Sequence, residues 1–363
     1  MTGTRLDQGT GIVATAHQAS ALPMPPLLVL DVVEKFLDEH GLGVGSLEVT
    51  RIGEGQSNVT YRIRREGADL VLRRGPRPPL PRSTHDMIRE ARVQGVLADQ
   101  GFPVPRIRAV CEDESLLGVP FYVMDHLAGE VITGALPQEF SAVQDRSGLS
   151  ATMVDTLAQL HAVDISQDSV RRLGRPEGYL ERQVSRFTEL WKVNTTREVP
   201  SVERLASWLG ENRPVTQRHA VIHGDYRMGN LMFATERPAR VKAVLDWEMA
   251  TLGDPLADLG YMSATYAEPG EESTVLELTS VTRMSGFHTR DDLIESYARS
   301  SSLDLEALPW YQVMALWKAA IFCEAIYTRW LCGERPDDTD FASQLEAGVP
   351  LLLEKAQDFA AEW

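Results

Sequence analysis

The sequence predicts an α+β fold with two lobes: a small N-terminal lobe with a five-stranded antiparallel sheet plus helices, and a large, mostly helical C-terminal lobe. Short alternating apolar segments, separated by turn residues, mark strands in the first third of the chain. Apolar residues at helical spacing dominate beyond Gly129. The 363 residues exceed the size at which one hydrophobic core keeps growing, so we expect two lobes.

Three regions are expected along the chain. Residues 1–26 are rich in Gly, Ala, Thr and Pro without a sustained period, which predicts a poorly ordered extension. Residues 27–126 would form the N-lobe and residues 127–363 the C-lobe. The N-lobe begins with a helix over residues 27–40, which stops at two glycines.

The pattern then changes from helical to alternating and back. In the N-lobe it predicts strands over residues 47–52, 59–64, 70–73, 107–110 and 120–124, and a helix over 84–99. In the C-lobe it predicts helices over 153–161, 179–191, 202–210, 291–299, 310–330 and 341–359, with short strands at 220–222, 231–234 and 241–245.

Two motifs in the C-lobe suggest phosphoryl transfer. His223-Gly-Asp225 is followed by Asn230, and Asp246-Trp-Glu248 comes after the next pair of strands. The Asp-x4-Asn spacing equals that of the protein-kinase catalytic loop, where a base and a metal-binding amide share one turn. Each motif alone could be an ordinary turn or strand end. Two motifs in this order, each after an apolar strand, predict an ATP-dependent small-molecule kinase.

These motifs resemble those of the aminoglycoside phosphotransferase and choline kinase family, which has a protein-kinase-like fold. Its catalytic loop reads His-Gly-Asp-x4-Asn and its metal motif reads Asp-Trp-Glu; residues 253–259 also fit. Residues 71–76 and 88–90 are most similar to the kinase-like domain fused to some acyl-CoA dehydrogenases. Here that domain would stand alone. The resemblance covers roughly residues 28–350.

The C-lobe roles follow from this resemblance. Asp225 would act as the catalytic base for the acceptor hydroxyl, and Asn230 and Asp246 would hold Mg²⁺ against the phosphates of ATP. These three side chains should converge on one cation position in a cleft between the lobes. Four supporting residues are expected: His223 bracing the loop, Asp258 supporting it from below, Glu248 near a second metal, and Arg227 at the γ-phosphate, at the acceptor or in solvent.

The N-lobe would bind the nucleotide. Ser57 and Asn58 end a glycine-containing loop that could cover the phosphates, although a plain hairpin is the simpler reading. The extended segment with Val123, Met124 and His126 would face the adenine. The remaining two nucleotide contacts are expected to be Arg73 and Glu90.

Arg73 is the main departure from the family pattern. A lysine usually holds the α- and β-phosphates from this strand, paired with a helix glutamate, here Glu90. Arginine is bulkier and hydrates differently, so the exchange is not neutral. Arg74 is the alternative, but strand alternation sends it to the opposite face.

Composition limits the class of protein. The net charge of −16 disfavours nucleic-acid binding. No apolar run is long enough for a membrane span, and no secretory leader is visible, so we expect a cytoplasmic monomer or homodimer. Three cysteines, Cys111, Cys323 and Cys332, suggest neither a disulfide framework nor a zinc site.

The acceptor is left open. An acidic segment with Glu268, Glu271 and Glu272 would suit an amino sugar or would simply be solvated. The similarity to dehydrogenase-linked domains favours a hydroxyacyl-CoA or a related metabolite instead. A pseudokinase that only binds nucleotide, and a hydrolase with Asp225 as nucleophile, are the remaining alternatives.

Overall fold

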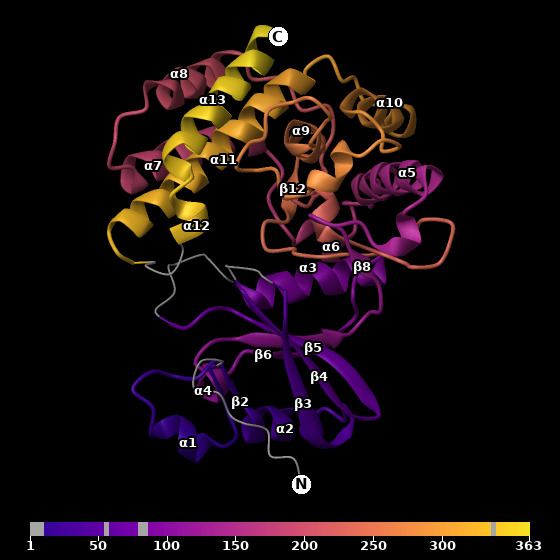
Figure 1. Ribbon diagram of the computed structural model, residues 1–363, viewed down its shortest axis with the longest axis vertical. Coiled ribbons are helices and arrows are strands. Elements are labelled where there is room, and N and C mark those ends of the chain that lie inside the picture. The colour runs from indigo at the N-terminus through magenta and orange to yellow at the C-terminus, as the bar shows by residue number, and fades with distance from the viewer. Residues whose placement is uncertain (1–10, 54–57, 79–85, 335–338) are drawn as a thin grey trace. The chain divides into compact units, whose positions relative to one another are not determined.

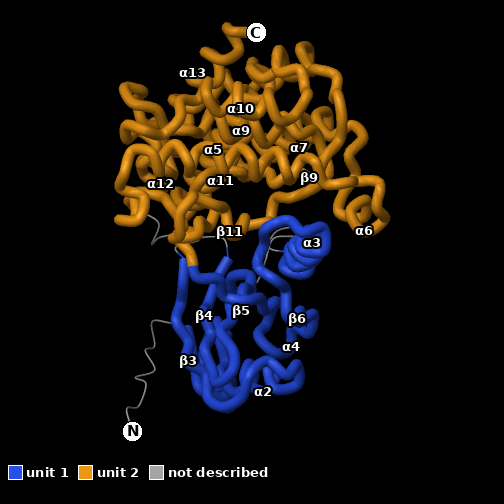
Figure 2. The backbone as a smooth tube through the Cα atoms, turned by 90° about the vertical axis from the view of Figure 1, so that its right-hand side faces the viewer, with its two compact units in different colours: residues 1–128 blue, residues 129–363 orange. Residues whose placement is uncertain are grey.

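The computed structural model describes residues 11–53, 58–78, 86–334 and 339–363. The chain divides into two compact units, residues 1–128 (unit 1) and residues 129–363 (unit 2), coloured separately in Figure 2. No helix in the described ranges is both long and apolar enough to cross a membrane. Ser57 and residues 84–85 of the expected helix lie outside the described residues.

Unit 1 is built on a five-stranded antiparallel sheet, as predicted, with strand order β3-β4-β5-β7-β6. Its strands are β3 (Val44–Ile52), β4 (Val59–Glu66), β5 (Ala68–Arg74), β6 (Ile107–Cys111) and β7 (Phe121–Asp125). Each runs within a few residues of its predicted bounds. The fold class predicted from the sequence is confirmed.

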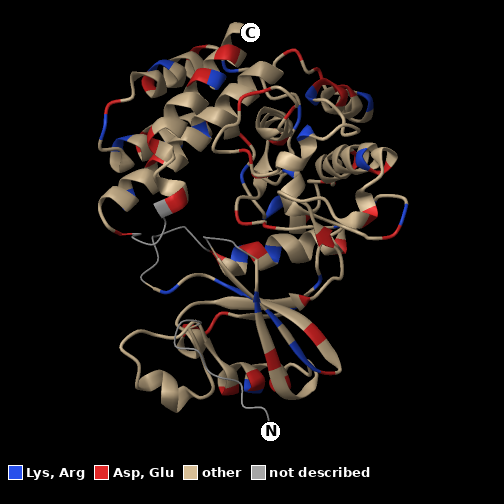
Figure 3. Ribbon diagram, in the orientation of Figure 1, with Lys and Arg blue, Asp and Glu red and all other residues tan. Residues whose placement is uncertain are grey.

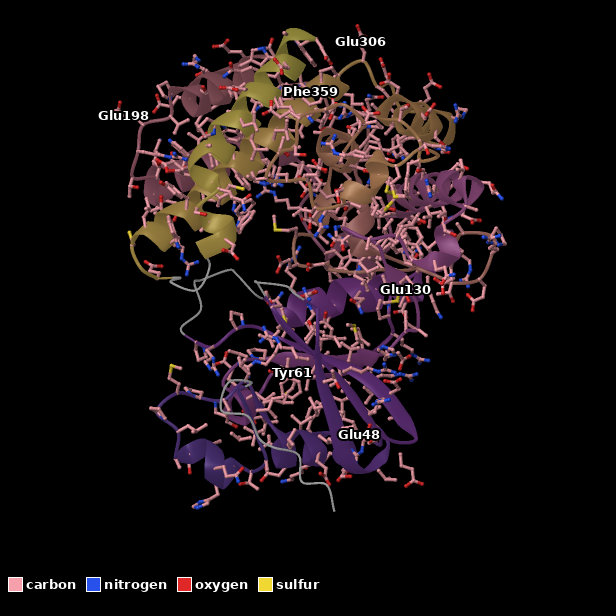
Figure 4. The ribbon with its side chains drawn as sticks, in the orientation of Figure 1. Glu48, Tyr61, Glu130, Glu198, Glu306 and Phe359 are labelled. Carbon is pink, nitrogen blue, oxygen red and sulfur yellow. The ribbon has the colours of Figure 1, made fainter. Side chains whose placement is uncertain are left out.

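Side-chain alternation explains this sheet. Successive residues of β4 point to opposite faces, so Val59, Tyr61 and Ile63 are buried on one side. Tyr61 is labelled in Figure 4. These residues join Leu70, Leu72 and others in one hydrophobic core. The helix α2 (Leu30–Glu39) covers this face with three buried residues, and its Phe36 ring lies 4.9 Å from that of Phe121.

The segment before α2 contains more structure than expected. Within the region predicted to be a poorly ordered extension, β1 (Ile12–Val13) and α1 (Ala16–Ser20) are formed. β1 pairs in parallel with β2 (Leu28–Val29). Thr15 caps α1 because its side chain accepts from the Gln18 backbone N–H. Partly buried apolar residues of this segment, including Ile12 and Ala19, pack on the core of unit 1.

The helix α3 (Met87–Asp99) adjoins β6 and β7, and its Asp86 N-cap side chain accepts from the backbone N–H of Arg89. Glu90 lies in the first turn of α3 and is 1% exposed. A charge buried this deeply requires a partner. The short helix α4 (Glu114–Leu117) ends at Gly118, whose φ of 82° suits a residue without a Cβ.

Unit 2 is mostly helical, as predicted. Its helices are α5 (Val143–His161), α6 (Asp168–Arg171), α7 (Tyr179–Asn194), α8 (Pro200–Glu211), α9 (Leu256–Thr265), α10 (Arg290–Ser301), α11 (Leu308–Leu331), α12 (Thr339–Ala342) and α13 (Leu345–Ala361). Three short 3-10 helices complete it, η1 (Gln138–Phe140), η2 (Met228–Asn230) and η3 (Ser280–Arg283). The single helix predicted over residues 341–359 is divided into α12 and α13.

The helix α11 runs through the core of unit 2, packed by α7, α8, α9 and α13 (Figure 1). It is apolar on nearly every side, which is typical of a helix surrounded by others. Trp310 and Trp317 are fully buried, and their ring N–H groups donate to the carbonyl oxygens of Leu209 and Val202 at 3.1 and 3.0 Å. α11 is therefore a fixed support for the segments beside it.

Short strands in unit 2 carry the two sequence motifs. They are β8 (Glu130–Val131), β9 (Ala220–Ile222), β10 (Leu231–Phe233), β11 (Val241–Val244) and β12 (Thr251–Gly253). β9 pairs with β12, and β10 lies between β8 and β11, all antiparallel. These pairings bring the residues after β9 next to those after β11.

Charged residues of both signs are interspersed along the outer helices of unit 2 (Figure 3). Several pair in the solvent, as Glu295 does with Arg299 at 3.8 Å. Exposed pairs of this kind contribute little to stability. The apolar contacts around α11 therefore dominate the stability of this unit.

Candidate functional site

The loop after β9 begins with a fully buried histidine that ties two segments together. The backbone N–H of Asp225 donates to Nδ1 of His223 at 3.2 Å, and Nε2 of His223 lies 2.9 Å from the carbonyl oxygen of Leu245. Because a backbone N–H can only donate and a carbonyl oxygen can only accept, Nδ1 accepts in the first contact and Nε2 donates in the second. His223 therefore connects the loop after β9 to the end of β11.

Asp225 lies at the centre of three side chains. Nδ2 of Asn230 donates to its carboxylate Oδ2 and to its backbone carbonyl oxygen, both at 2.8 Å. Nε of Arg227 lies 3.5 Å from the other carboxylate oxygen. The hydroxyl of Tyr261, on α9, is close enough for the charge of the same carboxylate to act on it. The Asn230 amide thus orients the carboxylate, with Arg227 and Tyr261 nearby, while the carboxylate remains partly exposed.

Burial raises the pKa of the Tyr261 hydroxyl well above its usual value, and the negative charge of Asp225 raises it further. The hydroxyl keeps its proton at neutral pH and can donate it to Asp225 in a hydrogen bond. Tyr261 is a neighbour of the expected base that the motif analysis did not identify.

The strand pair β10–β11 brings the second motif beside the first. The backbone N–H of Leu245 donates to the carbonyl oxygen of Asn230 at 2.8 Å, so Asp246 follows directly on this contact. Asp246 has a φ of 64°, in the left-handed region that non-glycine residues rarely adopt. Such backbone strain is concentrated at functional sites. This left-handed conformation turns the chain at Asp246 away from the direction of β11.

The donor set fits a magnesium ion. Nδ2 of Asn230 is used by Asp225, which leaves the amide oxygen Oδ1 to face elsewhere. An amide oxygen and the Asp246 carboxylate are both ligands of the hard type that Mg²⁺ prefers, and Mg²⁺ commonly keeps several waters. Within the described ranges, no three His, Cys, Asp or Glu side chains form a cage for another metal.

Asp258, at the start of α9, supports the loop from within the protein. It is fully buried, and its two carboxylate oxygens accept the backbone N–H groups of His223 at 2.6 Å and Gly224 at 2.7 Å. His161 adds Nε2 at 3.2 Å, while its Nδ1 lies 2.6 Å from the Tyr297 hydroxyl. This chain of contacts fixes the loop to α5, α9 and α10.

Burial would raise the pKa of Asp258, but the hydrogen bond from His161, the nearby imidazoles of His161 and His223 and the His223 backbone N–H lower it by more. The pKa is therefore below its ordinary value, and the carboxylate is ionised at neutral pH. His161, the last residue of α5, thus contacts both Asp258 and Tyr297.

Of the Asp-Trp-Glu motif, Trp247 is fully buried and donates its ring N–H to the carbonyl oxygen of Val244 at 3.0 Å. Its ring lies 4.7 Å from that of His223. Glu248 is partly exposed. Trp247 therefore holds the turn in which Asp246 lies, and the partly exposed Glu248 directly follows Trp247.

Unit 1 contains the predicted pairing of Arg73 with Glu90. Nε of Arg73 lies 3.0 Å from Oε1 of Glu90, and the hydroxyl of Tyr122 donates to the same oxygen at 3.1 Å. Arg73 and Tyr122 are direct cross-strand partners on β5 and β7, so both reach α3 from the same face of the sheet. Tyr122 was not identified from the sequence.

Arg74 has a different role, in accord with strand alternation. It is fully buried on the opposite face, where its guanidinium donates to the carbonyl oxygens of Leu27, Leu117 and Gly75. Burial lowers its pKa to about 10, so it remains charged at neutral pH. With its donors bonded inside unit 1, Arg74 serves packing, and Arg73 is the arginine of β5 that faces Glu90.

The other expected nucleotide residues are placed as follows. Val123 is fully buried within the sheet, and Met124 is nearly so. The backbone N–H of His126 donates to the carbonyl oxygen of Asp69, and its Nδ1 lies 3.4 Å from the Asp69 carboxylate. Asn58 is buried at the start of β4. The side chains of Val123 and Met124 thus serve the core of unit 1.

The acidic segment of unit 2 is largely neutralised by bases of the same unit. Nη1 of Arg290 lies 3.2 Å from Glu268 and 2.9 Å from Glu271. Nζ of Lys355, on α13, lies 3.1 Å from Glu271. Arg283 also donates to the backbone carbonyl oxygens of Glu268 and Glu271. This arrangement leaves Glu268 and Glu271 poorly placed to attract a cationic ligand.

A family model described as the phosphotransferase enzyme family matches residues 48–282, which include the loop after β9, the Asp246 turn and Asp258. The chain belongs to this family. Among relatives of known name, human acyl-CoA dehydrogenase family member 11 is 33% identical over 322 residues, which cover 85% of this chain and 40% of the relative. The chain thus spans less than half the length of that relative.

Among solved structures, a candidate aminoglycoside phosphotransferase from Ralstonia eutropha is similar with a TM-score of 0.74 and 26% identity, over 90% of this chain and 98% of that one. The aminoglycoside phosphotransferase APH(4)-Ia, solved with AMP-PNP and hygromycin B, shares the fold with a TM-score of 0.57 and 16% identity, over 89% and 98% of the two chains. The predicted family, its kinase-like fold and the assignment as a phosphotransferase are confirmed.

Proposed function

We propose that this phosphotransferase moves the γ-phosphate of ATP to a hydroxyl group of a small molecule, with Mg²⁺ as cofactor. The observation that carries the proposal is the pairing of Asp225 with Asn230, next to the left-handed turn at Asp246. A base, an amide oxygen and a carboxylate within one set of loops are the groups that kinase-type transfer requires.

In this proposal Asp225 acts on the acceptor. Its carboxylate, held by Asn230 with Tyr261 nearby, receives a hydrogen bond from the attacking hydroxyl. It takes the proton as the new O–P bond forms and the bond from the γ-phosphate to the β-phosphate oxygen breaks, which releases ADP. Arg227 lies beside this carboxylate, where its positive charge can contact the γ-phosphate or an acceptor oxygen. His223 and Asp258 keep the loop in place.

Asn230 and Asp246 would hold Mg²⁺, and Glu248 would reach a second ion through water. When bound, the metal neutralises phosphate charge and orients the β- and γ-phosphates. The strain at Asp246 supports this assignment, because residues held in a costly left-handed conformation are concentrated at functional sites.

We assign nucleotide binding to unit 1. Arg73, whose Nε lies 3.0 Å from Glu90, would place its guanidinium at the α- and β-phosphates, as arginine does at phosphate sites. The glycine-containing loop that ends in Ser57 and Asn58 would cover the phosphates. The extended backbone around Met124 and His126 would bind the adenine edge.

For the acceptor, the structure favours a metabolite over an aminoglycoside. Unpaired carboxylates attract an amino sugar, and two of the three carboxylates of this segment, Glu268 and Glu271, are paired with Arg290 and Lys355. Human acyl-CoA dehydrogenase family member 11 is more similar to this chain than APH(4)-Ia is. A hydroxyacyl-CoA or a related hydroxylated metabolite is therefore the acceptor class that we favour over an aminoglycoside.

The experiment measures transfer from γ-labelled ATP with Mg²⁺ to aminoglycosides, choline-like amines and hydroxyacyl thioesters. Asp225→Asn should abolish transfer while leaving ATP binding, followed by thermal shift, intact. Lys192→Met, a change on the exposed surface of α7, is the matched control that should leave both unaffected. ATP binding without transfer to any hydroxyl would support the pseudokinase alternative, and a phospho-aspartyl enzyme without acceptor would support the hydrolase.

A further inference from the structure

One lysine of unit 2 has no acidic partner among the described residues. The chain has only five lysines. Lys35, Lys192 and Lys355 lie within 4 Å of Glu39, Glu189 and Glu271, respectively. Lys242 also has an interaction partner. Within the described part of the chain, no carboxylate lies within ion-pairing distance of Lys318.

Lys318 is on α11 and is only partly exposed. Its amine lies 4.8 Å from the centre of the Phe187 ring on α7, an attractive arrangement for a cation. One turn further along α11, Phe322 is 41% exposed, and its ring packs on Phe187 at 5.0 Å. Arg186 precedes Phe187 and is near enough to influence the charge of Lys318.

These surroundings are costly for an ammonium group. Burial lowers the pKa of Lys318 to about 8, and the positive charge of Arg186 contributes to the shift. The negative charge of Asp258 raises the pKa of Lys318, against this shift. The oxygens of Asp258, however, already accept hydrogen bonds from His223, Gly224 and His161. The fold thus places a cation among apolar side chains without a carboxylate of the described residues in direct contact with it.

The helix α11 packs along α9, the helix that carries Asp258 and Tyr261. Asp258 holds the loop after β9 through the backbone N–H groups of His223 and Gly224, and its charge also acts on Lys318. The helix that carries Lys318 and Phe322 therefore runs beside the helix that supports this loop.

We propose that Lys318, with Arg186 beside it, binds an anionic group of the phosphate acceptor, and that Phe322 contacts the adjoining apolar part. The inference rests on the proposed function and deepens it. A carboxylate or phosphate of the acceptor would supply a negative group in direct contact with Lys318, where little water competes, which strengthens the interaction. The acceptor is then a hydroxyl compound with a negative group, the reverse of an amino sugar.

A protection experiment tests the site without requiring turnover. The full chain is acetylated with a neutral N-hydroxysuccinimide ester, and the modification of each lysine is followed by peptide mass spectrometry. Glycerol, glycerate and glycerol 3-phosphate are the probes, because they share a hydroxylated three-carbon skeleton and differ in charge. Potassium chloride at equal ionic strength controls for screening.

We expect an anionic probe to slow acetylation of Lys318 severalfold, while glycerol and potassium chloride leave it unchanged. Lys192 should react equally in all conditions. Protection by glycerate alone identifies a carboxylate site, and protection by glycerol 3-phosphate alone identifies a phosphate site. Arg186→Gln should weaken the protection. Equal Lys318 acetylation with all probes, or equal protection by glycerol, overturns the inference.

Kinetics separate this inference from the proposed function. For the best acceptor found, Lys318→Met should raise the acceptor KM by about tenfold or more, with the KM for ATP unchanged, and Lys318→Arg should retain most of the affinity. Transfer that depends on Asp225 but is unaffected by Lys318→Met would refute the anion site and leave the kinase standing. Loss of ATP binding in the unmodified chain would refute the kinase.

Discussion

The amide of Asn230 donates to both the backbone carbonyl oxygen and the carboxylate of Asp225, each at 2.8 Å. One side chain therefore fixes the proposed base in position and direction, and the same contact turns the amide oxygen toward a proposed metal ligand position. The two functions expected of the Asp-x4-Asn motif, orientation of the base and metal binding, therefore both depend on the amide of Asn230.

Removal of this amide should affect chemistry more than folding. Asn230→Ala is expected to lower kcat by a factor of about 100 or more, because it disorders the base and removes a magnesium ligand. The loss of stability should be about 1 kcal/mol, the usual value of such hydrogen bonds. Steady-state kinetics across magnesium concentrations, together with urea unfolding, measure both. An unchanged kcat would contradict the assignment.

Removing one partner of the buried ion pair between Arg73 and Glu90 should destabilise the protein strongly. Arg73→Met leaves Glu90, which is 1% exposed, without its cation and should cost about 3 kcal/mol of stability. The double variant with Glu90→Gln should recover part of this loss, since no uncompensated charge remains. Thermal unfolding of the three variants forms the cycle. Additive losses would show that the two residues do not interact.

Arg73→Lys tests the departure from the usual lysine. Lysine keeps the positive charge but lacks the forked geometry of the guanidinium. We therefore expect the KM for ATP to change severalfold in either direction while the fold is retained. A variant with unchanged KM and kcat would show that only the charge matters at this position.

Asp258 predicts a pH-dependent contribution to stability. Its pKa is lower in the folded protein than the ordinary 3.8. A carboxyl of this kind adds stability that is fully present above its unfolded pKa and is lost as the pH falls through the folded value. Asp258→Asn should therefore be less stable than the unmodified protein at pH 7, and the gap should narrow below about pH 4. Urea unfolding from pH 3 to 7 measures this difference, and a constant gap would contradict it.

Tyr261→Phe should show whether its hydroxyl serves the base. The ring stays in place and only the hydroxyl, whose pKa the nearby Asp225 carboxylate raises, is lost. We expect kcat to fall about tenfold, equivalent to about 1.4 kcal/mol, with the melting temperature nearly unchanged. Tyr266→Phe, which removes a hydroxyl donating to the His288 carbonyl oxygen, is the matched control and should leave kcat unaffected.

The acidic segment provides a test of acceptor class. Glu271→Gln removes a partner of Arg290 and Lys355 and should lower stability by about 1 kcal/mol. The change should leave the acceptor KM unchanged, because the Glu271 carboxylate pairs with Arg290 and Lys355 and does not contact the acceptor in this proposal. A rise in KM for an aminoglycoside on this change would instead support an amino-sugar kinase.

The sequence by itself determined the sheet, most of the helices and the motif residues. Alternation in β4 and helical spacing in α7 and α11 are local patterns that follow directly from strand and helix periodicity. The motif around Asp225 was recognisable because residue spacing within one loop is also local. Even the opposite roles of Arg73 and Arg74 follow from the two-residue repeat of a strand.

Only the tertiary structure showed which distant side chains meet. Tyr122, Tyr261 and His161 come from separate elements, and no local pattern marks them as neighbours of Glu90, Asp225 and Asp258. The same holds for Glu271, whose charge suggested a ligand site until its contacts with Arg290 and Lys355 were seen. Charge is a property of one residue, whereas its availability depends on partners that packing brings from elsewhere in the chain.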